Sequence, residues 1–198
     1  MVAIRDEGGR IEVVCGSMFS GKTEELIRRL RRAMFGRLRV QAFKPAIDRR
    51  YHDTQIVSHV AISLEAEVVA DAKALLDRVR PDTEVVGIDE VQFFGVELIA
   101  VVEALADRGV RVICAGLDQD YRGKPFEPVP QLLAIAEDVA KCHAVCTVCG
   151  GSASRSQRIL AKTDSRIQVG AAEAYEARCR RCFEDPDKAQ AVHHRAAV

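Results

Sequence analysis

The sequence predicts an α/β protein with a mainly parallel sheet, followed by a small cysteine-rich domain. Three observations support this fold class. β-Rich runs alternate with amphipathic helices, a glycine-rich phosphate-binding motif stands between the first strand and the first helix, and two Cys-x-x-Cys pairs follow. A chain of 198 residues suits one principal domain with a small accessory one. We expect the core in residues 1–140, the cysteine-rich domain in 141–183 and a loose, charged tail in 184–198.

The first elements are predicted to form a βαβ unit. Residues 10–15 are a short β-rich run, and residues 22 to about 35 place apolar side chains at helical spacing with two acids in the first turn. Residues 39–44 are the next expected strand. The segment 45–53 is too polar and irregular for a regular element, and loops at the ends of parallel strands are where sites are usually built.

The later elements continue the alternation of strands and helices. A helix at 71–79 is ended by Pro81, and one at 96–108 is ended by Gly109. The polar stretch 116–130, with three prolines, breaks the pattern, and a helix from 131 to about 139 resumes it. The strands expected in this part lie near 56–59, at 84–88 and at 110–115.

Composition limits the class of protein. Lys plus Arg balance Asp plus Glu at 29 each, whereas a protein that coats nucleic acid normally has a basic excess. The first helix carries a basic cluster, for which we prefer a solvated helix face over a nucleic-acid contact. There is no run of 18 apolar residues and no signal-peptide pattern, so we expect a cytoplasmic chain with no membrane partner. The members of the basic cluster are Arg28, Arg29, Arg31 and Arg32.

The segment Gly16–Thr23 has the form GxxxxGK[ST], which is typical of a phosphate-binding loop. Its glycines allow positive φ, so that successive backbone N–H groups can turn inward around an anion. Lys22 would reach the β- and γ-phosphates, and the Thr23 hydroxyl would hold Mg²⁺. A β-rich run precedes the motif and a helical pattern follows it, as such a loop requires.

A second motif, Asp89-Glu90, follows the hydrophobic strand expected at 84–88. An acid in this place, downstream of a phosphate loop, typically helps to hold Mg²⁺, which we assign to Asp89. The second carboxylate, Glu90, could act as a general base toward an attacking water, as in an ATPase, or toward a substrate hydroxyl, as in a kinase. The motif itself leaves both open.

The third motif is a pair of CxxC knuckles, Cys146/Cys149 and Cys179/Cys182, with 29 residues between them. Four thiolates in two pairs satisfy the tetrahedral preference of structural Zn²⁺. A redox role is disfavoured, because two such motifs would be needed and neither opens a thioredoxin-like helix. Cys142 and His143 are alternative ligands whose spacing fits less well. The cysteines at 15, 114 and 142 are expected as buried thiols.

Together these motifs resemble the type II thymidine kinases, the cytosolic family that transfers the γ-phosphate of ATP to thymidine. The resemblance covers residues 11–183 and implies a RecA-like P-loop NTPase core with a C-terminal zinc-ribbon lasso domain. It also implies a homotetramer and feedback inhibition by dTTP, whereas the expectation of no nucleic-acid partner comes from the neutral net charge. The segments that carry it are Gly16–Thr23, Lys44–Tyr51, Ile88–Phe94, Gly116–Asp118, Lys124–Phe126 and the four cysteines of the knuckles.

The resemblance further assigns roles to residues. It implies that Glu90 is the base for the thymidine 5′-hydroxyl, with Lys22 and Arg50 stabilising charge. Tyr121 would stack on thymine. Gly170-Ala171 replaces an expected Gly-Gly, and Gln168 replaces a branched apolar residue, which affects the contacts with the base. The implied ATP site comprises Cys15, Gly16, Ser17, Met18, Phe19, Ser20, Gly21, Lys22, Thr23, Asp89, Glu90, Val91 and Gln92. The implied substrate site comprises Met18, Asp48, Arg50, Glu90, Gln92, Phe93, Leu117, Tyr121, Phe126, Ser156, Gln168, Val169, Gly170 and Tyr175.

Two other classes of protein share some of these motifs. A RecA-like DNA-dependent ATPase can combine a phosphate loop, acidic strand ends and a four-cysteine module, but neutral charge and short length count against it. A non-catalytic nucleotide-binding or zinc-ribbon interaction protein would have little use for Glu90 beside Asp89. The aromatic residues at 121, 126 and 175 could also be ordinary core side chains.

Overall fold

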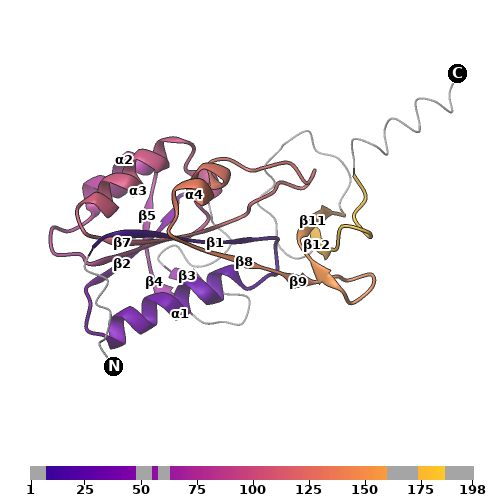
Figure 1. Ribbon diagram of the computed structural model, residues 1–198, viewed down its shortest axis with the longest axis horizontal. Helices are drawn as coiled ribbons and strands as arrows, with labels where there is room; N and C mark the ends of the chain where they lie inside the picture. The colour runs from indigo at the N-terminus through magenta and orange to yellow at the C-terminus, as the bar shows by residue number, and fades with distance from the viewer. Residues whose placement is uncertain (1–7, 48–54, 58–62, 160–173, 186–198) are drawn as a thin grey trace, which may run out of the picture.

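A computed structural model describes residues 8–47, 55–57, 63–159 and 174–185, and its centre is a six-stranded sheet (Figure 1). The strand order is β5-β2-β6-β7-β1-β8, and every pairing between these neighbours is parallel. The predicted α/β class with a mainly parallel sheet is therefore confirmed. The strands are β1 (Arg10–Gly16), β2 (Val40–Pro45), β5 (Glu67–Val69), β6 (Val85–Ile88), β7 (Arg111–Gly116) and β8 (Asp138–Cys142).

Helices cover both faces of the sheet. In Figure 1, α1 (Lys22–Phe35) lies on one side and α2 (Ala72–Arg78), α3 (Glu97–Asp107) and α4 (Val129–Ile135) lie on the other. Each side has its own apolar core. The α1 side centres on Leu26, Ile27 and Leu30, and the opposite side on side chains of α2, α3 and α4. None of the helices in the described ranges is long and apolar enough to cross a membrane.

Smaller hairpins and one short helix complete the described chain. The cysteine-rich region forms the hairpins β9–β10 and β11–β12, which in Figure 1 lie beyond one end of the sheet. A short 3₁₀ helix, η1 (Val91–Phe93), follows β6. The paired short strands are β3 (Gln55–Val57) with β4 (Ser63–Glu65), β9 (Ala144–Val145) with β10 (Ser152–Ala153), and β11 (Arg155–Arg158) with β12 (Tyr175–Arg178).

One predicted element is wrong. The helix expected from 131 to about 139 ends at Ile135, and Val139 lies in β8. The edge of β1 provides the reason, because its backbone groups need partners. The Ile11 N–H donates to the Glu137 carboxylate at 2.6 Å, and the Glu137 N–H donates to the Ile11 carbonyl at 3.0 Å. β8 continues to Cys142, just past residue 140, and the division into domains stays a prediction.

A carboxylate is buried in the middle of this apolar scaffold. Glu12 of β1 is 1% exposed. Its oxygens accept from Arg29 of α1 at 2.6 Å, from Arg111 of β7 at 2.6 and 3.0 Å, and from Arg10 at 2.8 Å. Burial raises the pKa of Glu12, but the hydrogen bonds from Arg111 and Arg29 outweigh it and hold the pKa below its usual value. Arg29 is therefore turned inward, unlike the exposed Arg28 of the same basic cluster.

The arginine pairs of Glu12 lead to a prediction about stability. Glu12→Gln keeps the size of the side chain but removes the buried carboxylate that pairs with Arg29 and Arg111, of which Arg29 keeps its bonds to Glu25 and Asp138. Loss of one partner of a buried pair typically costs about 3 kcal/mol of unfolding free energy. Urea denaturation should show a lower midpoint at an unchanged slope. Glu103→Gln, at an exposed position of α3, is the matched control; equal midpoints for the two variants would contradict the assignment.

Candidate active site

The phosphate loop joins β1 to α1 at the carboxyl edge of the sheet. Three of its residues have positive φ: Gly16 at 145°, Phe19 at 65° and Gly21 at 83°. A Cβ atom on Gly16 would lie 2.2 Å from the carbonyl oxygen of Cys142, so only glycine fits there. The buried Lys22 ammonium donates to the Ser17 carbonyl at 2.8 Å, which folds the side chain back over the loop.

The two residues predicted to hold Mg²⁺ are in contact. The Thr23 hydroxyl, in the first turn of α1, donates to Asp89 Oδ2 at the end of β6 across 3.3 Å. Hydroxyl and carboxylate oxygens are ligands that Mg²⁺ prefers. The parallel sheet thus brings together two motifs that are 66 residues apart in the chain. The donor set fits a hard divalent cation.

Glu90 is fixed by its backbone and by two neighbours. It adopts left-handed φ and ψ of 52° and 43°, a conformation that costs a non-glycine residue about 1–3 kcal/mol and that clusters at functional sites. Its N–H donates to Asp89 Oδ1 at 2.9 Å. Gln92 donates from Nε2 to the Glu90 carboxylate, and its Oε1 accepts the Leu117 N–H at 3.0 Å. A carboxylate held in this way has the preorganisation that a general base needs.

The loop after β7 supplies aromatic side chains. Asp120 shapes its turn, since its Oδ1 accepts from the N–H groups of Arg122 and Lys124 at 2.9 and 3.0 Å. The Phe126 ring meets Phe93 edge to face, with ring centroids 6.4 Å apart and planes at 87°. Two members of the implied substrate site, from η1 and from this loop, therefore lie side by side.

The β11–β12 hairpin meets this loop through an arginine that the sequence did not single out. The Arg158 guanidinium lies 3.9 Å from the centroid of the Tyr121 ring and donates to the Tyr175 hydroxyl at 3.1 Å. Ser156 accepts the Met18 N–H at 3.0 Å. The hairpin thus brings Tyr121, Tyr175, Ser156 and Met18 to one region. Arg158 ends a continuous polar run, Arg155–Arg158, which carries no sequence signal that would have marked it.

Other predicted residues are buried or lie outside the described ranges. The side chains of Cys15 and Val91 are 1% and 0% exposed, so contacts of theirs with ATP would use backbone atoms. Burial raises the pKa of Cys15 to about 11, with a contribution from Asp118. Asp118 itself pairs with Lys141 at 2.7 Å. The predicted residues outside the described ranges are Asp48, Arg50, Gln168, Val169 and Gly170.

The four cysteines of the knuckles gather into one cluster that could bind a metal ion. Their sulfur atoms all lie within 4.8 Å of one another, and Cys149 and Cys179 are 3.7 Å apart. Backbone N–H groups, first that of Cys179, lower the pKa of Cys146 to about 6. The hydrogen bond with Cys179 and the crowding of thiols raise the pKa of Cys182 to about 12. The pKa values of these two thiols are thus shifted in opposite directions, and a bound cation would remove the difference by favouring the thiolate form of all four cysteines. Cys142 instead lies in β8, paired with Gly16.

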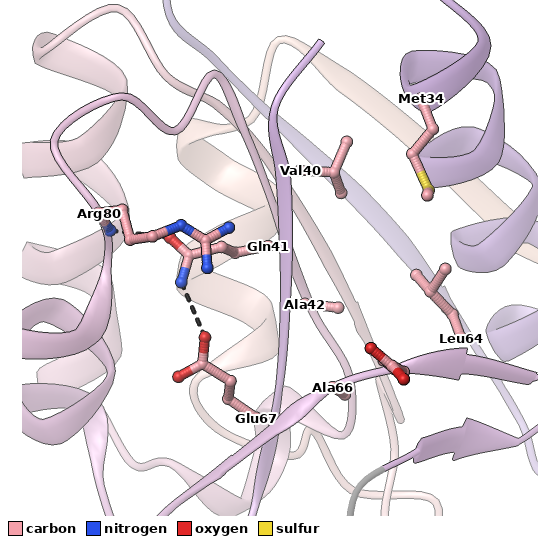
Figure 2. Close-up of a pocket in the computed structure, with 9 residues that line it drawn as sticks. Met34, Val40, Gln41, Ala42, Leu64, Ala66, Glu67 and Arg80 are labelled. Atoms are coloured by element: carbon pink, nitrogen blue, oxygen red, sulfur yellow. Dashed lines mark hydrogen bonds between the residues drawn. The ribbon is translucent and has the colours of Figure 1, made fainter. Parts of the chain in front are cut away.

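A pocket at β2 is separate from these residues, and its lining side chains lie on both sides of that strand (Figure 2). It lies at the amino-terminal part of β2, whereas ligands of open parallel sheets bind at the carboxyl ends of strands. Gln41 in its wall donates to Glu67 at 2.8 Å and to the Arg78 carbonyl at 3.1 Å, and it accepts from Arg80 N and Thr83. Protein partners thus satisfy this amide. The lining residues are Met34, Val40, Gln41, Ala42, Leu64, Glu65, Ala66, Glu67 and Arg80.

Comparison with known proteins agrees with the geometry of the carboxyl edge. The family described as thymidine kinase matches residues 9–183. A thymidine kinase of Bdellovibrio bacteriovorus is 57% identical over 176 residues, which span 89% of this chain and 86% of the relative. A thymidine kinase of Rhodothermus sp. is 56% identical over 178 residues, which span 90% of this chain and 83% of the relative. The chain therefore belongs to the thymidine kinase family.

Proposed function

We propose that the protein transfers the γ-phosphate of MgATP to the 5′-hydroxyl of thymidine and releases dTMP and ADP. The observation that carries this proposal is the Glu90 carboxylate, held by Gln92 next to Asp89, which in turn contacts Thr23 of the phosphate loop. A base, the cation ligands and the phosphate grip therefore share one edge of the sheet. The relatives named thymidine kinases support thymidine as the acceptor.

Each residue has a defined part in this reaction. Glu90 takes the proton of the 5′-hydroxyl as that oxygen attacks the γ-phosphorus and the bond to the β-phosphate oxygen breaks. General-base assistance of this kind is worth roughly 10²–10⁴ in rate. Lys22 and the loop amides bind the phosphates and stabilise the charge on the transferred group, and we assign a similar role to Arg50. Thr23 and Asp89 would hold Mg²⁺, which neutralises phosphate charge when it is bound.

The nucleobase of the acceptor would be selected by hydrogen bonds and by its methyl group. We propose that backbone groups near Val169 and Gly170 pair with thymine N3–H and O4. Cytosine would present an acceptor and a donor to the same groups, and each buried mismatch costs about 1–3 kcal/mol. Uracil lacks only the methyl group, which is worth about 1 kcal/mol. Rejection of cytosine should therefore be much stronger than rejection of uracil.

A nucleoside panel with MgATP tests this function. Thymidine, deoxyuridine, deoxycytidine and deoxyguanosine are compared by formation of the 5′-monophosphate. We expect thymidine to be best, deoxyuridine to lose about fivefold in kcat/KM for the missing methyl group, and the other two to be nearly inactive. ATP hydrolysis stimulated by DNA, with no nucleoside monophosphate formed, would favour the DNA-dependent ATPase instead.

Glu90→Gln tests the base. The variant keeps the hydrogen bond with Gln92 in reach but cannot accept the proton, so kcat should fall at least about a hundredfold. MgATP affinity, measured by calorimetry, should persist because the loop is untouched. Glu103→Gln, exposed on α3, controls for a carboxylate lost elsewhere. Near-normal turnover of Glu90→Gln would remove Glu90 from this role.

We propose structural zinc as the metal of the cysteine cluster. Four sulfur donors within tetrahedral reach fit Zn²⁺ and leave no position for water. Metal analysis should find one zinc per chain in the wild type and a loss in Cys149→Ser or Cys182→Ser. Ser is a poor ligand for zinc, and so small a module depends on its metal for on the order of 10 kcal/mol of folding. Full zinc content in both variants would refute the four-cysteine site.

We further propose a cytoplasmic homotetramer that is inhibited by dTTP, as the family resemblance implies. A product-derived triphosphate offers thymine to the nucleoside site and phosphates to the loop, so one molecule could occupy both. Light scattering should give the mass of four chains. Inhibition by dTTP should be competitive with both thymidine and ATP, because dTTP would occupy both sites. A monomeric mass, or turnover that is insensitive to dTTP, would remove the corresponding proposal.

A further inference from the structure

Three successive residues of the phosphate loop contact the cysteine-rich module, by which we mean the strands β9–β12 with the four cysteines of the knuckles. The Ser17 hydroxyl donates to the Ala153 carbonyl at 3.5 Å, and the Met18 N–H donates to Ser156 at 3.0 Å. The Phe19 side chain packs against the small apolar core of the module, described below. The phosphate loop therefore contacts both the end of the sheet and the cysteine-rich module.

The backbone of Phe19 shows that this contact has a cost. Its φ of 65° lies in the left-handed region, which disfavours a side chain with Cβ by about 1–2 kcal/mol. Its position in the motif GxxxxGK[ST] accepts any residue, and glycine would adopt this φ freely. A phenylalanine at this position therefore has to gain its stability from what its ring touches. The ring touches the cysteine module.

The core of that module is unusually small. Among the described residues it consists of Ala144, Ala153, Ala177 and the sulfur-bearing side chains of Cys146, Cys179 and Cys182, with Phe19 packed against them. Alanines and cysteines bury little apolar area, so the order of the module depends on its metal. Among the described residues of this cluster, Phe19 has the only large apolar side chain. Three of the four cysteines thus share a core with a residue of the phosphate loop.

We propose that Phe19 is a positioning residue through which the metal-filled cysteine module holds the phosphate loop in its ATP-binding shape. Loss of the metal would loosen the wall against which the ring packs, and the loop would lose the conformation that presents its amides. By thermodynamic linkage, ATP must in turn strengthen retention of the metal. The proposal rests on ATP binding by the loop and on the metal of the module, and it does not depend on which nucleoside is phosphorylated.

The first test measures MgATP affinity by calorimetry, without nucleoside, on metal-loaded protein. Phe19→Ala and Phe19→Gly should both weaken binding by about tenfold or more, equivalent to about 1.4 kcal/mol. Phe19→Leu should restore part of the affinity. The glycine variant separates the ring from the backbone, because it relieves the strain and still removes the packing. Phe35→Ala removes a phenylalanine that is 87% exposed at the end of α1 and is the matched control. Wild-type affinity in both the alanine and glycine variants would overturn the proposal.

The second test measures the coupling between the two sites. A chelator that strips the metal should weaken MgATP binding in the wild type and have a much smaller further effect in Phe19→Ala, because the link is already cut. Equal losses in both proteins would overturn the proposal, since they would show a route that bypasses the ring. A failed nucleoside panel would refute the proposed function and leave these two measurements unaffected.

A third measurement decides the matter if the Phe19 variants do not fold. The rate at which wild-type protein releases zinc to a chromogenic chelator is followed with and without saturating MgATP, with Mg²⁺ in excess so that the nucleotide does not itself bind zinc. We expect severalfold slower release with MgATP, and in the folded Phe35→Ala control as well. An unchanged release rate would overturn the proposal without any variant at position 19.

Discussion

The hydrogen bond between Thr23 and Asp89 is the contact around which the candidate site is arranged. It joins the first turn of α1 to the end of β6. β7 lies between β1 and β6 and pairs with both in parallel, so the carboxyl ends of β1 and β6 lie at the same edge of the sheet. The hydroxyl and the carboxylate are hard oxygen donors, so the same pair that is bonded here suits a divalent cation. Glu90, one residue further, is thereby held beside this pair, with its N–H bonded to Asp89 Oδ1.

A second constraint fixes the direction of Glu90. Its left-handed backbone turns the chain into η1 directly after β6, and Gln92 then reaches back to the carboxylate and across to Leu117. A Cβ atom on Gly116 would lie 2.6 Å from Gln92 Oε1, so a glycine at the end of β7 makes this approach possible. The Glu90 carboxylate is therefore positioned by the ends of β6 and β7, and the hydrogen bonds of Gln92 offset the backbone strain at Glu90.

The motifs with local chemistry were predictable from the sequence. The phosphate loop, the Asp89-Glu90 pair and the two knuckles are each recognisable within a few residues, and hydrophobic periodicity predicted α1, α2, α3 and the strands β1, β2, β6 and β7. What the sequence missed depends on partners far along the chain. Glu12 and Arg29 look like surface charges until β1 and α1 are brought together. Residues 138 and 139 form a strand instead of the expected helix because the edge of β1 is open to pairing. The short β5 is a strand because it pairs with β2.

The Phe19 contact suggests why a kinase of this kind would carry a metal in a module that performs no chemistry. A phosphate loop must hold several amides inward against the entropy of its backbone, about 1–2 kcal/mol per fixed residue. The sheet restrains its beginning and α1 its end, and residues 17–19 between them contact the module, Ser17 and Met18 by hydrogen bonds and Phe19 by packing. A bound metal contributes on the order of 10 kcal/mol to the folding of such a module. The ordered module could then restrain these three residues, because their backbone entropy costs less than this. The lasso would then serve the phosphates as much as the nucleoside.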